Sequence, residues 1–180
     1  QVLNDAVALL WSQDPPGNGG AEGVVSMMIG AGINIAAHLP AQRLPKVPFL
    51  PEKKYLTVSF EVGAYTPDLL SSLDDEVDAY SENPGEQRLE KAIGHIYLSE
   101  LLRRSRAVSE ATRHETQQAI ANRSLLLVDA VLRATKKFMR VEHLRVILGG
   151  RRIWGNLANW GINREELESL QEALKAEDIR

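Results

Sequence analysis

The chain has 180 residues and a formal net charge of −3, with 44% hydrophobic and 25% charged residues, a composition typical of one globular domain. It contains no cysteine, which excludes disulfides, thiolate metal sites and thiol catalysis and fits a reducing compartment. No apolar run reaches the roughly 20 residues that span a bilayer, and no signal peptide is visible. We therefore expect a cytoplasmic protein without a membrane span.

The small net charge conceals a segregation of charge along the chain. Residues 1–87 hold 4 Lys/Arg against 12 Asp/Glu, residues 88–152 hold 14 against 6, and residues 153–180 hold 3 against 6. Such asymmetry is typical of a protein that binds partners. The alternatives are acidic ends that fold back over the basic middle, and head-to-tail contact between copies of the chain.

The N-terminal residues predict a helix followed by a flexible connection. Residues 2–11 have the spacing of a short amphipathic helix, whose apolar side could meet the core or a neighbouring chain. Two prolines and three glycines in residues 14–20 then end regular structure. We expect this loop to act as a hinge, which makes residues 1–20 a separate N-terminal unit.

Residues 24–39 form a nearly uncharged stretch whose pattern leaves open whether it is helix or strand. Ser26, Gly30, Asn34 and His38 recur every four residues, which on a helix would place them in one polar seam. Such a seam favours a close helix–helix contact over a binding site, although glycines weaken a helix by about 1 kcal/mol each.

The glycines of this stretch also resemble a dinucleotide-binding turn. That turn needs a third glycine for close helix–strand packing, and Ile35 occupies its position. The acidic residue expected about 20 positions later would be Glu52, which lies among prolines, and no second β-α-β unit follows. We reject a dinucleotide site on these grounds.

A connector and a strand follow. Residues 40–52 carry four prolines and predict an extended connector. Residues 55–62 alternate between apolar and polar side chains, which predicts a half-buried strand. Its partner strand could come from an irregular part of this chain, from residues 145–153, or from another chain that adds to the sheet edge.

A short acidic helix is predicted from Thr66 to about Tyr80, with Thr66 as its N-cap and Pro67 in its first turn. One side of this helix is apolar. The other side offers a partner an acidic face that consists of Asp74, Asp75, Glu76 and Asp78. These carboxylates lack the alternating ligand spacing and central glycine of a calcium loop, so we expect no metal site.

Two longer helices form the centre of the predicted fold. Residues 86–108 show the apolar spacing of an amphipathic helix, with Gly94 inside its apolar stripe. Residues 109–140 contain no glycine or proline and predict a second helix about 45 Å long. The two helices could form a hairpin or one continuous rod.

Residues 149–180 resemble a helix-turn-helix, with a turn at Gly161 and a second helix capped by Asn163. The second helix carries six acidic residues, so repulsion from phosphates makes its insertion into DNA implausible. We interpret these residues as a packing segment.

Cationic residues gather between positions 103 and 152 and could contact phosphates or an acidic partner. The candidates are Arg103, Arg104, Arg106, Arg123, Arg133, Lys136, Lys137, Arg140, Arg151 and Arg152. Phosphate contacts through these side chains predict a nucleic-acid-binding protein. Against that function stand the net acidic chain and the few aromatic residues available to stack bases.

Catalytic groups are sparse in the sequence. Glu110 and His114 lie one helical turn apart and could supply two metal ligands, but no third ligand is evident. The other three histidines are isolated, and no nucleophile motif or phosphate loop occurs. We therefore predict that the protein is not an enzyme and has no catalytic residue, cofactor or metal.

Together these patterns predict a mainly α fold, a helical bundle built on one long central helix with a minor β element at residues 55–62. The predicted units are residues 1–20, a central domain of residues 21–148 and the packing segment of residues 149–180. The predicted function is that of a non-catalytic structural subunit of a larger, self-assembling complex. Other protein subunits are the predicted partners, with nucleic acid as the alternative.

Overall fold

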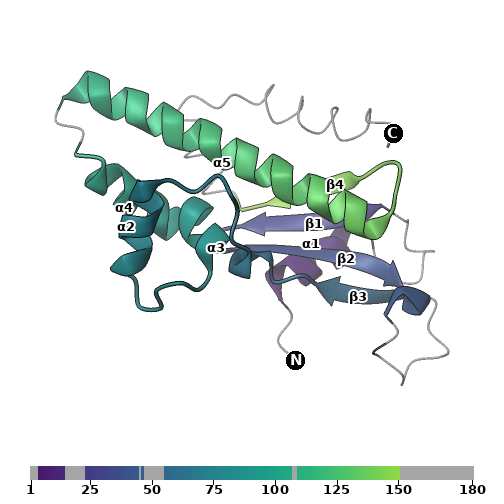
Figure 1. The fold of residues 1–180 in the computed structure, drawn as a ribbon. Coiled ribbons are helices and arrows are strands. Elements are labelled where there is room, and N and C mark those ends of the chain that lie inside the picture. The colour runs from purple at the N-terminus through teal and green to yellow at the C-terminus, as the bar shows by residue number, and fades with distance from the viewer. Residues whose placement is uncertain (1–3, 15–22, 45, 47–54, 107–108, 151–180) are drawn as a thin grey trace.

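The computed structural model describes residues 4–14, 23–44, 46, 55–106 and 109–150, and shows a sheet with helices on both faces (Figure 1). The helices are α1 (Asp5–Gln13), α2 (Ser72–Ala79), α3 (Arg88–Ile93), α4 (His95–Arg104) and α5 (Glu110–Met139). The strands are β1 (Val24–Ile29), β2 (Ile33–Pro40), β3 (Tyr55–Ser59) and β4 (Arg145–Gly149). Two 3-10 turns are η1 (Ala41–Arg43) and η2 (Val62–Ala64).

The described strands form one mixed sheet in the order β3-β2-β1-β4. β1 and β2 are an antiparallel hairpin that turns at Gly30, whose N–H donates to the Gly32 carbonyl over 2.7 Å. β3 pairs antiparallel with β2, and β4 pairs parallel with β1. The architecture is mixed α/β, so the expectation of a mainly helical bundle is wrong.

The hairpin explains why its strands were hard to recognise. Val25, Met27 and Ile29 belong to the main core under α5, whereas Val24 belongs to a smaller core under α1. Both faces of β1 and β2 are therefore buried, and such strands read as continuous apolar runs without a polar face. The recurrence of small and polar residues every four positions marks one face of the hairpin, not a seam on a helix.

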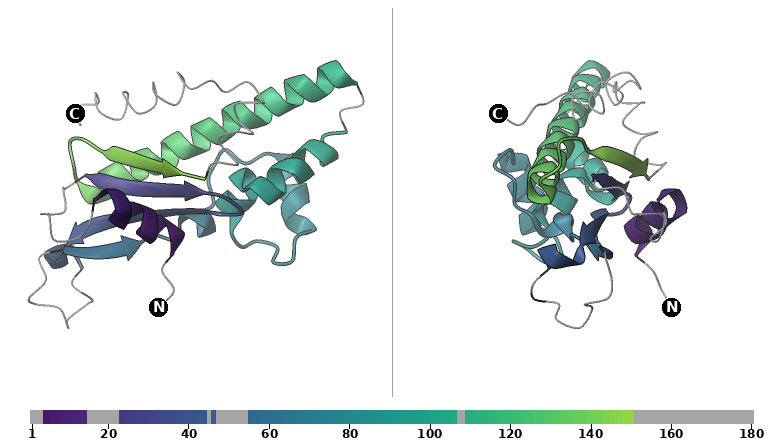
Figure 2. Two further views of the ribbon diagram at one scale, coloured as in Figure 1. Left: turned by 180° about the vertical axis from the view of Figure 1, so that it is seen from behind. Right: turned by 90° about the vertical axis from the view of Figure 1, so that its right-hand side faces the viewer.

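Helices cover the sheet on opposite faces, as the end-on view in Figure 2 shows for α1 and α5. α5 packs Leu127, Val128 and Leu132 into the main core. Its start matches the prediction, because the Ser109 side chain caps the helix and forms a capping box with Thr112. The α5 helix therefore covers one face of the β1–β2 hairpin.

The predicted helix at residues 86–108 is two helices, α3 and α4, which meet at Gly94. A Cβ at Gly94 would clash with the Ala31 carbonyl oxygen, and the adjacent His95 N–H donates to the Gly30 carbonyl over 2.9 Å. The close approach of the hairpin turn therefore interrupts the helix. α2 also differs from its prediction, since Ser71 rather than Thr66 is its N-cap.

Two further predictions meet different outcomes. The predicted strand at residues 55–62 is present as β3, and its partner is β2 rather than residues 145–153. Of the packing segment predicted at residues 149–180, Gly149 ends β4 and residues 151–180 lie outside the described residues. The division into three units stays a prediction. Within the described ranges, no helix is long and apolar enough to cross a membrane.

Candidate functional site

A polar pocket of about 240 Å³ opens at the end of the sheet where β1 turns into β2. The hairpin turn lines it through Gly30, Ala31 and Gly32, and other lining residues come from the start of α1, from Glu61 just before η2 and from α3. The polar side chains that line it are Asn4, Asp5, Asn34, Glu61 and Glu90. Three carboxylates and two carboxamides thus converge from four separate parts of the chain.

Asn34 and Glu61 form a connected pair inside this pocket. The Asn34 amide nitrogen donates to Glu61 Oε1 over 3.0 Å and to Ser59 Oγ over 2.8 Å, while its amide oxygen accepts the Ile35 N–H. Ser59 Oγ also donates to Glu61 Oε1 over 2.8 Å. These contacts orient the Glu61 carboxylate and leave its second oxygen available to a ligand.

The backbone at Glu61 adopts an uncommon conformation with φ of 47°. A left-handed conformation is costly for a residue with a side chain and is often found where function requires it. Phe60 and Val62 pack against the main core as Val58 does, while Glu61 lies with Ser59 on the other face and lines the polar pocket. The strained backbone therefore coincides with a carboxylate of the site.

Glu90 reaches the pocket through space that two glycines leave open. A Cβ on Gly32 would collide with Glu90 Oε2, and a Cβ on Gly63 would lie 3.2 Å from the same atom. Burial raises the pKa of Glu90, the nearby Glu61 charge raises it further, and the Lys91 charge and the Ile33 N–H oppose the rise. The Glu90 carboxylate is therefore held in a site where its charge is poorly solvated.

Buried ion pairs hold α3, the helix that carries Glu90. Lys91 is 3% exposed, and its Nζ donates to Asp78 Oδ1 and to the Asn83 carbonyl, each over 2.6 Å. Burial alone would raise the pKa of Asp78, but hydrogen bonds from Lys91 and the Gly85 N–H, with the charges of Lys91 and Arg88, lower it. α3 is thus fixed to α2 through the residue that follows Glu90.

Asn4 and Asp5 stand at the start of α1. The Asn4 carboxamide caps the helix by accepting the Ala6 N–H over 3.0 Å, and Asp5 Oδ1 accepts the same N–H over 2.8 Å. The positive end of the helix favours a carboxylate at this position. Asp5 is exposed, so its other oxygen can reach a bound molecule.

The chemistry of the lining suits a neutral ligand with many hydroxyl groups. Carboxylates accept hydrogen bonds from hydroxyls, and carboxamides both donate and accept. No lysine or arginine is among the residues that line this pocket, which makes it a poor site for phosphate. Among the described residues no group of three or more His, Cys, Asp or Glu could hold a metal ion.

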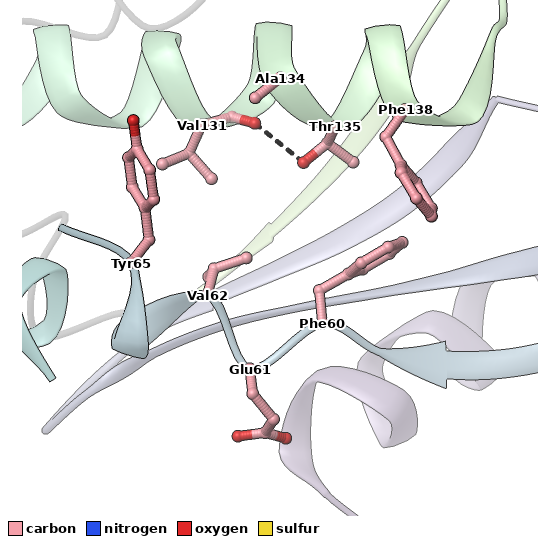
Figure 3. Close-up of a pocket in the computed structure, with 8 residues that line it drawn as sticks. All are labelled: Phe60, Glu61, Val62, Tyr65, Val131, Ala134, Thr135 and Phe138. Atoms are coloured by element: carbon pink, nitrogen blue, oxygen red, sulfur yellow. Dashed lines mark hydrogen bonds between the residues drawn. The ribbon is translucent and has the colours of Figure 1, made fainter. Parts of the chain in front are cut away.

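A second, apolar pocket of about 390 Å³ lies between α5 and the segment after β3 (Figure 3). Phe60 and Phe138 meet edge to face across it, with ring centroids 5.5 Å apart. Figure 3 shows the Glu61 side chain turned away from the other side chains that line this pocket. The other polar side chains of its lining are Tyr65 and Thr135, and the Thr135 hydroxyl donates to the Val131 carbonyl over 2.8 Å. This pocket therefore offers a polyhydroxylated ligand fewer hydrogen-bonding groups than the polar pocket does.

Four of the ten predicted cationic residues pair with carboxylates of the chain. Arg103 and Arg104 pair with Glu100, Arg123 pairs with Asp74, and Arg133 pairs with Asp129. Arg106 is exposed and Lys136 is buried, while Lys137 and Arg140 line a hollow beside η1. Arg151 and Arg152 lie outside the described residues. The structure does not gather these side chains into the polar pocket.

The acidic residues of the predicted face also differ in whether they have a partner within the chain. Asp74 and Asp78 are buried against Arg123 and Lys91, and Asp75 pairs with Arg88 over 2.5 Å. Only Glu76 of this face is exposed without a partner in the described part of the chain. Three acidic residues of this face are thus neutralised by cations from residues 88–152.

Sequence reasoning missed the polar pocket. It noted Asn34 as part of a seam and placed Glu61 on the polar side of a strand, but connected neither to a site. The remaining signal was the pair of glycines at Gly30 and Gly32, which mark a close approach of backbone to another group. Without the hairpin and α3 in place, nothing indicated that Glu90 would fill that space.

Comparisons with known proteins agree on one family. A family model described as hexokinase matches residues 24–145. The chain is 34% identical to the chloroplastic hexokinase-2 of Nicotiana tabacum over 113 residues, 57% of this chain and 20% of that protein. It is 38% identical to hexokinase-2 of Arabidopsis thaliana over 84 residues, 45% of this chain and 17% of that protein.

Solved structures show the same fold. A hexokinase from Schistosoma mansoni complexed with glucose has a TM-score of 0.76 at 16% identity, covering 99% of this chain and 52% of that one. A second hexokinase structure has a TM-score of 0.67 at 18% identity, covering 98% and 49%. The chain therefore spans about a fifth of these curated relatives and about half of these solved chains.

These matches correct the functional predictions. They overturn the non-catalytic structural subunit, the alternative of a nucleic-acid-binding protein, and the prediction that the protein is not an enzyme. The predictions failed because they rested on segregated charge, part of which is paired inside the fold at Asp74 with Arg123 and at Asp78 with Lys91.

Proposed function

Since the chain belongs to the hexokinase family, we propose that it forms the sugar-binding side of an enzyme that phosphorylates a hexose. The observation that carries this proposal is the polar pocket, in which three carboxylates and two carboxamides converge. Asn34, Glu61 and Glu90 lie inside the residues that the family model matches, and Asn4 and Asp5 precede them. Glucose, bound by one of the solved structures, is the first sugar to test.

Hydrogen-bond chemistry supports the assignment of a sugar to this pocket. A hexose presents several hydroxyls in fixed directions, and each hydrogen bond to a charged group contributes about 1.5–3 kcal/mol. Asn34 and Glu61 are already oriented by one another and by Ser59, so binding loses little further side-chain freedom. A site built on such groups rejects an analogue that lacks a hydroxyl, because a carboxylate that the bound ligand shields from water would be left without a donor.

Asp5 is the residue that we assign as general base. In phosphoryl transfer the attacking hydroxyl gives up its proton, and a carboxylate within reach accepts it. Glu61 is engaged with Asn34 and Ser59, and Glu90 accepts the Ile33 N–H of the hairpin. Asp5 is exposed at the pocket rim and accepts only the Ala6 N–H beside it among the described residues.

The phosphoryl donor has a different requirement from the sugar. A nucleoside triphosphate carries several negative charges, which the acidic lining of this pocket would repel. We infer that cations outside the pocket bind the donor, and that the described pocket contributes recognition and deprotonation of the sugar.

Titration calorimetry of the 180-residue chain with glucose tests the proposal. We expect saturable binding that Asn34→Ala and Glu61→Gln each weaken by about 10-fold or more, since each removes a hydrogen-bonding group from the pocket. Glu76→Gln, the same change on the exposed face of α2, should bind as the unchanged chain does. Failure to bind glucose, mannose and fructose alike would refute the proposal.

Asp5→Asn separates binding from chemistry. The amide keeps the shape and much of the hydrogen bonding of Asp5, so glucose affinity should change by less than about 5-fold. Release of ADP in the presence of glucose and ATP should fall by about 10²–10⁴-fold, the usual contribution of a general base. An unchanged rate with Asp5→Asn would assign the proton to another carboxylate.

Two expectations from the sequence stay as proposals. We propose a cytoplasmic location. Two relatives carry names that place them in chloroplasts, so fractionation should check this proposal. Association with other protein subunits is the second, and light scattering after size exclusion would test it.

A further inference from the structure

α1, the helix that carries Asn4 and Asp5, is attached to the sheet by a small apolar surface. Its fully buried side chains are Ala6 and Leu10, which pack with Val24 and Ala36. A short helix with so little buried area owes part of its orientation to polar contacts. The position of the pocket residues on α1 therefore depends on the hydrogen bonds that tie this helix to the strands.

Those hydrogen bonds lie at both ends of α1. Near its start, Ser26 Oγ donates to the Ala6 carbonyl over 2.5 Å. Near its end, the Trp11 indole N–H donates to Thr57 Oγ1 over 2.9 Å. Thr57 lies directly opposite His38 in the β2–β3 ladder, and its Oγ1 is 2.9 Å from His38 Nδ1. His38 Nε2 in turn is 2.7 Å from the Asp14 carbonyl oxygen, just beyond the helix.

One arrangement of hydrogens satisfies every contact in this relay of Trp11, Thr57, His38 and Asp14. The Asp14 carbonyl can only accept, so His38 Nε2 carries the hydrogen and His38 Nδ1 is an acceptor. The indole N–H can only donate, so Thr57 Oγ1 accepts it and gives its own hydrogen to His38 Nδ1. His38 is 1% exposed, so loss of a partner leaves a buried polar atom unsatisfied.

We propose that Thr57 and His38 are positioning residues, which hold α1 at one angle and thereby place Asn4 and Asp5 at the sugar pocket. This inference rests on the proposed function. Trp11 and Asp5 are about 9 Å apart along the helix axis, so a tilt of α1 by about 10° shifts its two ends relative to each other by about 1.5 Å. A displacement of that size is sufficient to impair a catalytic group substantially.

The test compares two substitutions of Thr57, a partly exposed residue whose replacement should leave the fold intact. Thr57→Val keeps the shape but removes the hydroxyl, which leaves the Trp11 indole and the His38 ring without their shared partner. We expect glucose affinity to fall by about 3–10-fold, the effect of losing about one hydrogen bond. Thr57→Ser retains the hydroxyl and should restore affinity to within about 2-fold of the original.

A matched control distinguishes positioning from general loss of stability. Thr135→Val removes a buried hydroxyl from α5, where Thr135 donates to the Val131 carbonyl and does not contact α1. Thr135→Val should leave glucose affinity unchanged, even where its melting temperature falls as far as that of Thr57→Val. Equal affinity in Thr57→Val and the unchanged chain would overturn the proposal.

Amide hydrogen exchange supplies a readout that needs no sugar. Thr57→Val should accelerate exchange across α1 while α5 keeps its protection, and Thr57→Ser should not. If the unchanged chain binds no sugar, the proposed function fails, and the anchoring of α1 then stands or falls on this exchange comparison. Unaltered α1 exchange in Thr57→Val would refute the anchoring.

Discussion

At the scale of single residues, the ionised Glu90 carboxylate lowers the stability of the folded state although the pocket needs it to bind a sugar. Burial raises its pKa above 4.5, so the folded state releases this proton at a higher pH than the unfolded state does. From pH 4.5 up to the raised pKa the folded state holds the extra proton, and stability decreases as pH rises. Above that range the ionised Glu90 carries its full cost to the folded state.

Glu90→Gln should therefore stabilise the chain at pH 7 while it weakens glucose binding. We expect a small rise in melting temperature, about 1–2 °C for a domain of this size. The rise should disappear below pH 4, where Glu90 is protonated in both states. Glucose affinity should fall about 10-fold or more, because a neutral amide replaces a charged acceptor. A lower melting temperature at pH 7 would mean that the buried Glu90 charge does not destabilise the fold.

At the scale of elements, α3 depends on the buried pair of Lys91 and Asp78. Lys91→Met leaves the Asp78 charge buried without its main partner, which costs about 3–5 kcal/mol. The double variant Asp78→Asn with Lys91→Met removes both charges and should recover most of this loss in urea unfolding. Recovery of less than about 1 kcal/mol would mean that the pair itself, rather than the unpaired charge, accounts for the stability of α3.

Individual elements also differ in how far the sequence predicts them. α5 was predictable because its cap at Ser109 and its amphipathic pattern are local. β1 and β2 were not, since helices bury both of their faces and erase the alternation that identifies a strand. The break at Gly94 depends on the hairpin turn that approaches it, a contact between segments about 60 residues apart in the chain.

At the scale of the whole molecule, the candidate site is a product of topology. Asn4, Asn34, Glu61 and Glu90 each come from a different segment, and no two of them share a local motif. The sheet order brings these segments to one end of the hairpin, so the site exists only once β1, β2 and β3 have paired. Composition and charge, in contrast, describe the surface and the ion pairs, and these are not specific to a sugar site.

The stability of the whole molecule in acid should depend on Glu100, an ion-pair partner of two arginines. The pKa of Glu100 is lowered to about 2. The largest cause is the hydrogen bond from Arg103, and the hydrogen bond from Arg104 lowers the pKa further. The stability from these pairs is complete above about pH 4.5 and is lost as pH falls toward 2. Pairs this close to the surface contribute little, because solvent screens their charges.

Glu100→Gln tests this dependence by urea unfolding at several pH values. The variant should be less stable than the unchanged chain at pH 7 by at most about 1 kcal/mol, and the difference should vanish near pH 2. The slope of unfolding free energy against urea should be the same in both proteins, because the substitution exposes no additional surface. A difference that persists unchanged at pH 2 would show that Glu100 stabilises α4 by packing rather than by charge.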